Sequence, residues 1–550
     1  MKKLKRLLNE KTIKMTKIDY IIIGIIIALY SILSFINLGT LKNPQTFCYL
    51  GNDKTLVFEL TEKTNITRVK FYSGDIAGQY VIYGSLNNKD YDYITTLSSN
   101  GVFAWNDEII NANVKYIKLL SISESYLGEV AFYNNKQIIN IKSVTKDNNK
   151  IKKVTDELET VPKQVSHLNS SYFDEIYFAK TSYDYKEKLE AYEWVHPPLG
   201  KMIQAIPVIL FNKMSPFFYR LMGNIFGIFM LFIMYLFGKQ IFKMRKWAII
   251  SSLLMFFDTF HFTQTRIGTI DSFLVFFIML SLYFMYKYIS NKNSNHFLFL
   301  SGLFFGLSVC IKWTGFLSGL ALAVIYFIDV IKHKKNIKKA ILFGAIYFII
   351  VPLIMYISFY LIYPNNQVTY TDSIKDIFIQ TKEMFKYHST LEESHFFSSE
   401  WYTWPLSYKP VWYYTKDYNT NVRGTITAIG NIIIWWLGIV SIPYLVYKVF
   451  RKKEKESLFL LIVILSLWLP YIFISRVMFL YHYFPVTPFM MLAVVRLLKE
   501  IENKTQNKTI IICYMALVIT FFILYYPVIS GMPVTNNYID MLKLLDSWYF

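Results

Sequence analysis

An adjacent pair of carboxylates, Asp174 and Glu175, lies among aromatic residues in the segment 172–200. A carboxylate held beside a hydroxyl group can accept the proton of that hydroxyl in a group-transfer reaction. A His-Pro-Pro-Leu-Gly-Lys run, which contains His196 and Lys201, follows and opens the next apolar segment. The pair alone would also fit a helix with a solvated acidic face. The combination makes this segment the first candidate for a catalytic site.

Four further polar residues lie at the ends of apolar stretches: Arg220, Asp271, Lys312 and His482. An ionisable side chain at such a position is unfavourable unless it has a partner, which makes a functional role the first interpretation. Cationic side chains there could bind a phosphate through charge-assisted hydrogen bonds. Arg220 and Lys312 could instead anchor their segments at a membrane interface, and Asp271 could cap a helix. His482 could equally hydrogen bond to a neighbouring helix.

A second polar segment, residues 387–414, is rich in histidine and tryptophan. Its candidates for contacts with a second substrate are His388, His395, Trp401 and Trp404. Indole faces suit carbohydrate surfaces and interfacial packing equally well. The two histidines have no third ligand at metal-binding spacing, so we predict no structural metal and no required cofactor. A divalent metal ion in the reaction stays open.

The composition indicates a polytopic membrane protein. Of the 550 residues, 54% are hydrophobic and 18% aromatic, and the formal net charge is +20. Basic clusters flank apolar stretches, so the charge favours a bilayer partner and no nucleic acid. About eleven stretches approach the roughly 20 residues that cross a bilayer. They are predicted at 19–38, 218–238, 247–263, 270–289, 297–311, 315–331, 340–362, 425–447, 457–474, 477–495 and 509–529.

The distribution of lysine and arginine predicts the orientation. The first 17 residues are basic, and further basic clusters lie at 243–246, 332–339, 451–456 and 496–508. Cytoplasmic loops are enriched in these residues, so the N-terminus and these clusters are predicted to be cytoplasmic. The long apolar run after the N-terminus favours an uncleaved first helix over a signal peptide. The loops 39–200 and 364–424 and the tail after 530 are then extracellular, in a multi-pass protein of the cell membrane.

Residues 46–142 differ from the rest, because short alternating segments separated by Gly, Asn and Asp replace the long apolar runs. This pattern is typical of an antiparallel β-sandwich. The predicted fold is therefore mostly α-helical and polytopic, with one inserted all-β domain. The predicted parts are a basic N-terminus with the first helix (1–45), the β-sandwich (46–142), a linker with the acidic pair (143–215), the transmembrane bundle (216–530) and an external tail (531–550).

The motifs together resemble the protein O-mannosyltransferases. The matching elements are the aromatic-Asp-Glu motif, His-Pro-Pro-Leu-Gly-Lys, Arg266-Ile-Gly-Thr-Ile-Asp271, Lys312-Trp-Thr-Gly, Trp401-x-x-Trp-Pro-Leu and His482-Tyr-Phe-Pro. The second long loop has no room for a β-trefoil MIR domain, which resembles the bacterial branch. The resemblance implies a GT-C membrane fold and an inverting transfer of mannose from polyprenyl-phosphate-mannose to Ser or Thr of a protein.

The resemblance also implies roles for the candidate residues. Asp174 would be the general base, and Glu175 would position the acceptor or its neighbours. The donor phosphate or sugar would contact Arg220, Asp271, Lys312, His482, His196 and Lys201. The acceptor would lie near His388, His395, Trp401 and Trp404.

The sheet segments resemble a discoidin or galactose-binding-like jelly roll, which implies glycan binding by residues 46–142, with a structural spacer as an equal alternative. For the whole chain, the runner-up function is transfer of a lipid-linked sugar to a lipid or cell-wall glycan. A transporter or flippase is less favoured, because no internal repeat is visible and the charged candidates cluster near one membrane face. A sugar-binding sensor would need a single span.

Overall fold

The computed structural model describes residues 14–146, 149–290, 294–362, 370–391 and 393–550. The basic segment 1–13 and the first part of the predicted loop 364–424 fall outside the described residues. The chain forms two compact units. The sheet unit is Asn37–Glu193 with Gln204–Leu221, and the helical unit is Met1–Ile36 and Trp194–Ile203 with Met222–Phe550. Helices α4 (Pro198–Phe211) and α5 (Pro216–Phe242) contribute residues to both units.

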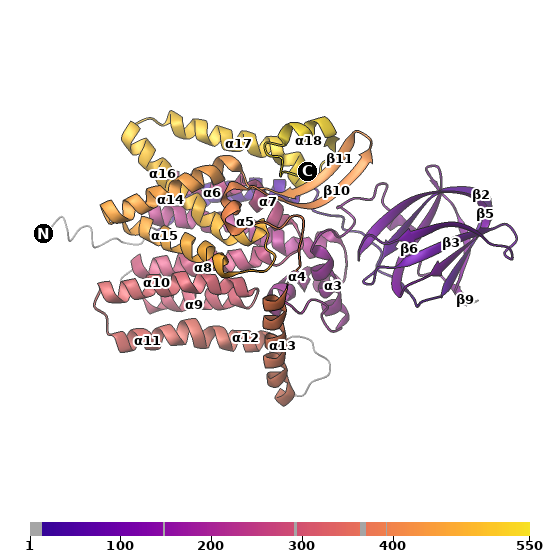
Figure 1. The fold of residues 1–550 in the computed structure, drawn as a ribbon, viewed down its shortest axis with the longest axis horizontal. Coiled ribbons are helices and arrows are strands. Elements are labelled where there is room, and N and C mark those ends of the chain that lie inside the picture. Colours follow the sequence, from indigo (N-terminus) through magenta and orange to yellow (C-terminus); the bar gives the residue numbers. More distant parts are fainter. Residues whose placement is uncertain (1–13, 147–148, 291–293, 363–369, 392) are drawn as a thin grey trace. The chain divides into compact units, whose positions relative to one another are not determined.

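The helical unit is a bundle in which α8 packs on α9 and α10, and α14 packs on α15 and α16 (Figure 1). Its other helices are α2 (Lys17–Phe35), α6 (Arg245–Phe256), α7 (Thr259–Arg266), α8 (Asp271–Ser290), α9 (Asn295–Val309), α10 (Phe316–Lys332), α11 (Ile337–Ala345), α12 (Val351–Ile362), α13 (Tyr370–Thr390), α14 (Ile432–Lys452), α15 (Lys455–Trp468), α16 (Thr487–Thr505), α17 (Thr509–Ser530) and α18 (Asn536–Leu542). A small antiparallel sheet comprises β10 (Val411–Asn419), β11 (Val422–Ala428) and β12 (Val534–Thr535).

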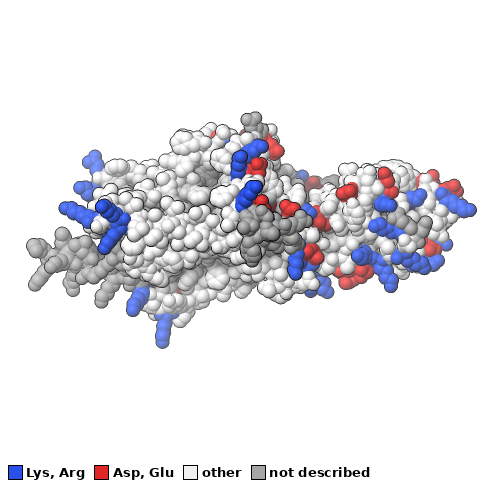
Figure 2. Space-filling model, turned by 90° about the horizontal axis from the view of Figure 1, so that it is seen from below, with Lys and Arg blue, Asp and Glu red and all other residues white. Residues whose placement is uncertain are grey.

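Eight helical segments among the described residues are long and apolar enough to cross a bilayer: Lys17–Phe35, Pro216–Phe242, Asp271–Ser290, Trp313–Lys332, Ile337–Ile362, Ile432–Lys452, Lys455–Phe473 and Thr509–Ser530. Helices α4 and α9 are apolar but shorter. Figure 2 shows a broad surface of the helical bundle without Lys, Arg, Asp or Glu, bordered at one end by Lys and Arg side chains. The prediction of a multi-span membrane protein is confirmed, whereas the count of eleven is not.

Five predicted spans are not continuous α-helices. The predicted span 425–447 begins in strand β11, 340–362 contains a π-helical turn at Ile346–Ile350, and 457–474 ends in the 3₁₀ helix Leu469–Phe473. The other two have a clear local cause. The predicted span 247–263 is divided between α6 and α7, because the Asp258 side chain accepts the backbone N–H of His261 at 3.0 Å and caps a new helix. The predicted span 477–495 begins with a 3₁₀ helix, Leu480–Val486, which contains Pro485. Proline removes a backbone donor and does not suit the interior of an α-helix.

Ion pairs join the ends of several helices at one end of the helical unit. Asp19 in the first turn of α2 binds Lys239 at 3.0 Å and Arg245 at 2.9 Å. The other pairs are Lys246–Glu502, Lys448–Glu500 and Arg496–Glu454. The residues belong to, or directly flank, four segments that were predicted to be cytoplasmic. The fold therefore brings these four segments to the same end.

The sheet unit contains antiparallel strands in the order β1-β6-β2-β5-β3-β4, with β7 beside β6, β8 beside β2 and β9 beside β8 (Figure 1). The strands are β1 (Cys48–Leu50), β2 (Thr55–Ser73), β3 (Gln79–Ser85), β4 (Asp92–Ser98), β5 (Ala104–Ser121), β6 (Ser125–Asn134), β7 (Gln137–Ile138), β8 (Ile141–Lys146) and β9 (Asn149–Ile151). The predicted all-β domain is present. Its resemblance to a discoidin jelly roll stays a prediction.

The sheet differs from the predicted pattern in two places. The alternation predicts two separate strands, LVFEL (56–60) and TRVKFYS (67–73). Both belong to one long strand, β2, whose pairing with β5 shifts register between Glu59 and Thr64. The polar residues at this irregularity resemble a turn in the sequence, which explains why two strands were expected. The sheet also continues past the predicted boundary at 142, because β8 pairs with β2 and Val144 and Val154 join its core.

Candidate functional site

The acidic pair lies in the sheet unit, at the start of helix α3 (Glu175–Glu187). Asp174 is the N-cap residue, but among the described residues its side chain makes no hydrogen bond that caps α3. Helix capping therefore does not explain this carboxylate. The preceding residue, Phe173, has a φ of +50°, a conformation that bulky residues seldom adopt. Such backbone strain is often found at functional sites.

Glu175 is fully buried and forms a bidentate ion pair with Arg220. Arg220 Nε lies 2.6 Å from Glu175 Oε1, and Nη2 lies 2.7 Å from Oε2. The guanidinium also donates to the carbonyl oxygens of Leu38 (2.9 Å), His167 (2.8 Å) and Ser170 (3.0 Å). All five N–H groups of Arg220 are thus engaged by protein atoms. This geometry does not favour the predicted contact of Arg220 with a donor phosphate.

Asp271 and Lys312 meet in the helical unit, where Lys312 Nζ lies 2.9 Å from Asp271 Oδ1. Asp271 begins α8, and Lys312 precedes the short 3₁₀ helix Trp313–Gly315. Lys312 Nζ also lies 5.6 Å from the centre of the Tyr481 ring. This ion pair supports the interpretation that Asp271 orients Lys312 and does not serve mainly as a helix cap.

His388 on α13 connects two loops of the helical unit. Its Nε2 lies 2.8 Å from the Val195 carbonyl oxygen, and its Nδ1 lies 2.6 Å from Arg476 Nη1. A carbonyl accepts and a guanidinium donates, so the proton belongs on Nε2. Burial, together with the charges of Arg476 and His196, lowers the pKa of His388 to about 4. The imidazole is therefore neutral at physiological pH and holds Arg476 in place.

Arg476 is a residue that the sequence analysis missed. It lies between α15 and α16, on the side predicted to be extracellular, where arginine is less frequent than in cytoplasmic loops. An arginine on the extracellular side is an exception to this distribution, and the exception could have identified Arg476 from the sequence. Arg476 belongs to none of the quoted family elements, so no motif identifies it.

His482 is 7% exposed, and its ring stacks on Trp404 with centroids 6.0 Å apart and planes at 14°. Burial, followed by the charges of Lys312 and Arg476, holds the pKa of His482 well below its ordinary range. Those two cations are thus close enough to act on the imidazole. Like His388, His482 is a neutral residue beside positive charges.

His196 and Lys201 complete this group. Lys201 Nζ donates to the His196 carbonyl oxygen at 2.8 Å, and the His196 ring lies 5.7 Å from the His388 ring. We call the set the cationic cluster: His196, Lys201, Asp271, Lys312, His388, Arg476 and His482. With His388 and His482 neutral, the cluster holds the cations Lys201, Lys312 and Arg476 and one carboxylate, a balance that suits a phosphate group.

The remaining loop candidates have mainly packing contacts. Trp404 is fully buried, and its Nε1 donates to Ser399. Trp401 lies against Trp468 with ring centroids 5.6 Å apart. The His395 ring lies 5.1 Å from that of Phe479. Trp404 therefore supports His482, and contacts of these residues with an acceptor stay a prediction.

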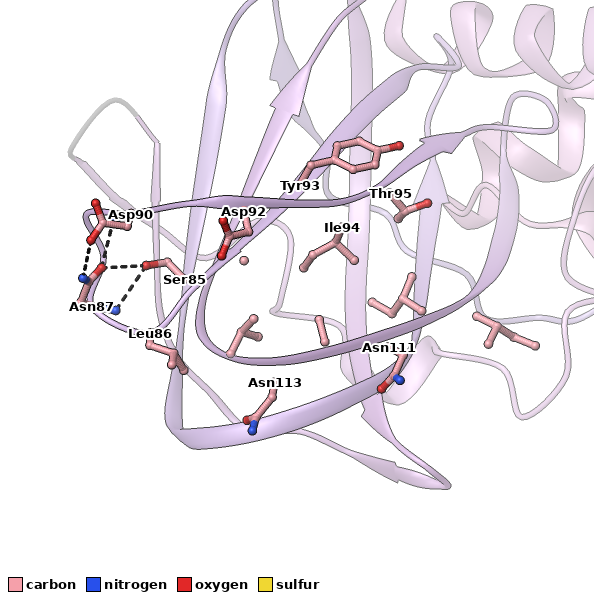
Figure 3. Close-up of a pocket in the computed structure, with 15 residues that line it drawn as sticks. Ser85, Leu86, Asn87, Asp90, Asp92, Tyr93, Ile94, Thr95, Asn111 and Asn113 are labelled. Atoms are coloured by element: carbon pink, nitrogen blue, oxygen red, sulfur yellow. Dashed lines mark hydrogen bonds between the residues drawn. The ribbon is translucent and has the colours of Figure 1, made fainter.

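The sheet unit also contains a groove of about 750 Å³ between β4 and the middle of β5 (Figure 3). Ile94 and Ile110 are among its apolar lining residues, and Asn111 and Asn113 are among the polar ones. Asn87 in the same lining accepts the backbone N–H of Asp90 at 3.0 Å, so part of the polar rim stabilises the β3–β4 turn. Glycan binding by the sheet domain stays a prediction, and this groove is the candidate binding site for a glycan.

Two family models match the chain. The model of dolichyl-phosphate-mannose-protein mannosyltransferase matches residues 163–367. The model of the C-terminal four TMM region of protein-O-mannosyltransferase matches residues 373–548. Strands β1–β9 lie outside both ranges.

Curated relatives include polyprenol-phosphate-mannose–protein mannosyltransferases from two bacteria. The protein from Mycobacterium tuberculosis is 23% identical over 422 residues, which cover 64% of this chain and 81% of the relative. The protein from Corynebacterium glutamicum is 22% identical over 424 residues, again 64% and 81%.

Among solved structures, the Saccharomyces cerevisiae protein O-mannosyltransferase Pmt1-Pmt2 complex bound to the sugar donor is similar to this fold. The match has a TM-score of 0.60 at 15% identity and covers 69% of this chain and 89% of that chain. At this level of identity the likeness concerns the fold.

Proposed function

Because the chain belongs to the protein O-mannosyltransferase family, we propose that it transfers mannose from a polyprenyl-phosphate-mannose donor to Ser and Thr hydroxyls of proteins. Family membership makes it a glycosyltransferase, which removes the transporter and flippase alternatives. The observation that carries the proposal is the acidic motif at Asp174 and Glu175, within the range of the matching family model. A transfer assay with purified protein, donor and peptide tests it.

The proposed reaction is a single displacement at the anomeric carbon of the donor. The Asp174 carboxylate accepts the proton of the acceptor hydroxyl, and the hydroxyl oxygen forms a bond to the anomeric carbon. The bond from that carbon to the phosphate oxygen breaks, and the polyprenyl phosphate leaves with the electron pair. Attack on the face opposite the leaving group inverts the configuration. No step requires an oxidant or a reductant.

The leaving phosphate gains negative charge, and we assign its stabilisation to the cationic cluster. Fixed cations at the position where charge develops act most strongly in the transition state. Lys312 and Arg476 are the direct candidates, because Asp271 orients the first and His388 the second. Arg220 is instead assigned to orienting Glu175, since its five N–H groups already have protein acceptors.

Arg476→Ala should lower kcat/KM for the donor by roughly 10²–10³, the usual effect of removing one donor from a site of developing charge. The KM for the acceptor peptide should change little. Arg476→Lys should recover part of the activity, because a point charge lacks the bidentate geometry of arginine. Steady-state kinetics with separately varied donor and peptide measure these effects.

The matched control is Arg423→Ala, which removes an ion pair with Asp417 (2.7 Å) on the β10–β11 hairpin of the same unit. It should have near-normal kinetics. Unchanged donor kinetics in Arg476→Ala would remove this residue from the donor site.

We further propose that the cationic cluster faces the outside of the cell and the ion-paired end faces the cytoplasm. The two lie at opposite ends of α16, since His482 precedes this 19-residue helix and the ion-paired residues Glu500 and Glu502 lie in its last two turns. A helix of that length spans about 28 Å, close to the thickness of a bilayer core. The basic segments gathered at the ion-paired end support a cytoplasmic location.

Cysteine labelling tests this orientation. In a Cys513→Ser background, Thr420→Cys on the β10–β11 hairpin and Asn52→Cys in the sheet unit should react with an impermeant maleimide on intact cells. Lys334→Cys, between α10 and α11, should react only after the membrane is permeabilised. Labelling of Lys334→Cys from outside would reverse the orientation.

A further inference from the structure

Residues 101–105, which contain the start of strand β5, form hydrogen bonds with the residues just before the acidic pair. Trp105 donates its backbone N–H to Ser170 Oγ at 3.0 Å. Ser171 donates its backbone N–H to the Phe103 carbonyl at 3.2 Å and its hydroxyl to the Val102 carbonyl. A short stretch of the sheet domain and residues 170–171 are therefore paired nearly residue by residue.

The same segment packs against helix α3. A Cβ built on Gly101 would lie 3.7 Å from Ile176 Cγ2. Phe103 is fully buried, and its ring lies 5.3 Å from that of Tyr183 on α3. A single buried hydrophobic cluster combines sheet residues with residues of the later segments: Tyr72, Phe103, Trp105, Val165, Ala179, Val208, Met214, Phe218 and Tyr219. The sheet domain thus shares a core with the segments around the acidic motif and is not tethered only by a linker.

An ion pair provides a further contact. Lys180 Nζ on α3 lies 3.3 Å from Asp75 Oδ2, which follows strand β2, and the two side chains are 15% and 9% exposed. Partly buried pairs are screened less by salt than exposed ones. Helix α3 is therefore fixed to the sheet along its first three turns.

Ser170 links the sheet to the acidic pair. Its hydroxyl accepts from Trp105, and its carbonyl accepts from Arg220 Nη2 at 3.0 Å. Arg220 in turn holds both oxygens of Glu175, the neighbour of Asp174. The strained residues Phe103 (φ +48°) and Phe173 (φ +50°) lie on the two sides of this contact. Strained backbone persists where the surrounding structure over-determines it.

From these contacts we propose that the sheet domain is a positioning element for the catalytic carboxylate, acting through residues 101–105 on Ser170 and Ser171. The strands lie outside both matched family ranges, so the proposal gives the catalytic carboxylate a support that neither family model includes. The proposal rests on the proposed role of Asp174 as base. In this proposal, Ser170 and Ser171 hold the segment that carries Asp174 in place. The sheet domain therefore supports catalysis directly and does not only recruit acceptors.

The test uses the full-length enzyme, a short Ser/Thr peptide and the combined variant Ser170→Ala/Ser171→Ala. We expect kcat to fall by about tenfold to 10²-fold, because a displacement of about 1 Å in a reacting group can have the larger effect. The KM values for donor and peptide should stay within about twofold, since neither serine is assigned to a substrate contact. Ser171→Thr, which keeps the hydroxyl, should retain most of the activity that Ser171→Ala loses.

Two comparisons separate positioning from general destabilisation. Ser143→Ala removes a hydrogen bond from Ser143 Oγ to Glu59 (3.1 Å) elsewhere in the sheet and should leave kcat unchanged. Addition of the two serine changes to Asp174→Asn should cause no further loss, because residues that act through one group are not additive.

Normal kcat in the double serine variant, an equal loss in Ser143→Ala, or a full additional loss in the Asp174→Asn background would each overturn the positioning proposal alone. An active Asp174→Asn enzyme would overturn the proposed function of Asp174 and the positioning role together, so the two failures are distinguishable.

Discussion

Asp174→Asn should lower kcat by roughly 10²–10⁴, the usual effect of a positioned general base. The substitution keeps the size of the side chain and removes its ability to accept the proton of the acceptor hydroxyl. The loss of thermal stability should be smaller than in Arg220→Ala, because this side chain neither caps α3 nor belongs to the buried Glu175–Arg220 pair. Single-turnover transfer to a peptide, measured with saturating donor, reports the chemical step.

Asp156→Asn is a matched control, since Asp156 is an exposed carboxylate of the same unit that accepts from the Thr46 hydroxyl at 3.1 Å. It should transfer mannose at the normal rate. If purified Asp174→Asn does the same, another group must accept the proton.

Arg220→Ala should destabilise the protein by about 3–5 kcal/mol, the usual result of removing one partner from a buried ion pair. Glu175 would be left buried with its charge uncompensated, and three backbone carbonyls would lose a donor. Activity should fall through kcat, because the segment before Asp174 loses its anchor. Arg220→Lys should recover only part of the stability, since one ammonium cannot reproduce five fixed donors.

The combined variant Glu175→Leu/Arg220→Leu separates charge from packing. Removal of both charges should make it more stable than Arg220→Ala, because apolar replacements of a buried pair are often tolerated. It should still be nearly inactive if the pair fixes the acidic motif. Thermal unfolding and donor kinetics measure the two effects. An Arg220→Ala protein of normal stability but weakened donor binding would return Arg220 to the donor site.

Asp174 and Glu175 show which properties of the site could be predicted from the sequence and which could not. The motif identified both residues, but two adjacent carboxylates look equivalent in a sequence. Their difference arises from burial and from a partner 45 residues away, which depends on the tertiary fold. The motifs also identified Arg220, but as a contact of the donor phosphate and not as the partner of Glu175. A sequence does not show how many N–H donors of a guanidinium are already bound to protein acceptors.

The cationic cluster shows the same limit. Lys312, Asp271 and His482 were recognisable because each lies at the end of an apolar stretch. These three residues come together only because the fold brings loops from distant parts of the chain to one place. The contact of His388 with Arg476 depends on the fold in the same way. In the sheet, alternation placed a segment in each of β2, β3, β4, β5 and β6, whereas the first half of β5 and the continuity of β2 across its irregular pairing were not visible. The shared core between the sheet and the acidic motif has no local sequence pattern at all.

The most direct test of the central claim is transfer by the purified protein, in lipid nanodiscs, with a polyprenyl-phosphate-mannose donor. A Ser/Thr peptide, the same peptide with every Ser and Thr replaced by Ala, and a lipid or cell-wall glycan acceptor are offered in parallel. The account predicts a mass increase of one hexose on the Ser/Thr peptide, none on the Ala peptide, and loss of the product in Asp174→Asn. Hexose on the lipid or glycan acceptor, with the Ser/Thr peptide unmodified, would contradict it.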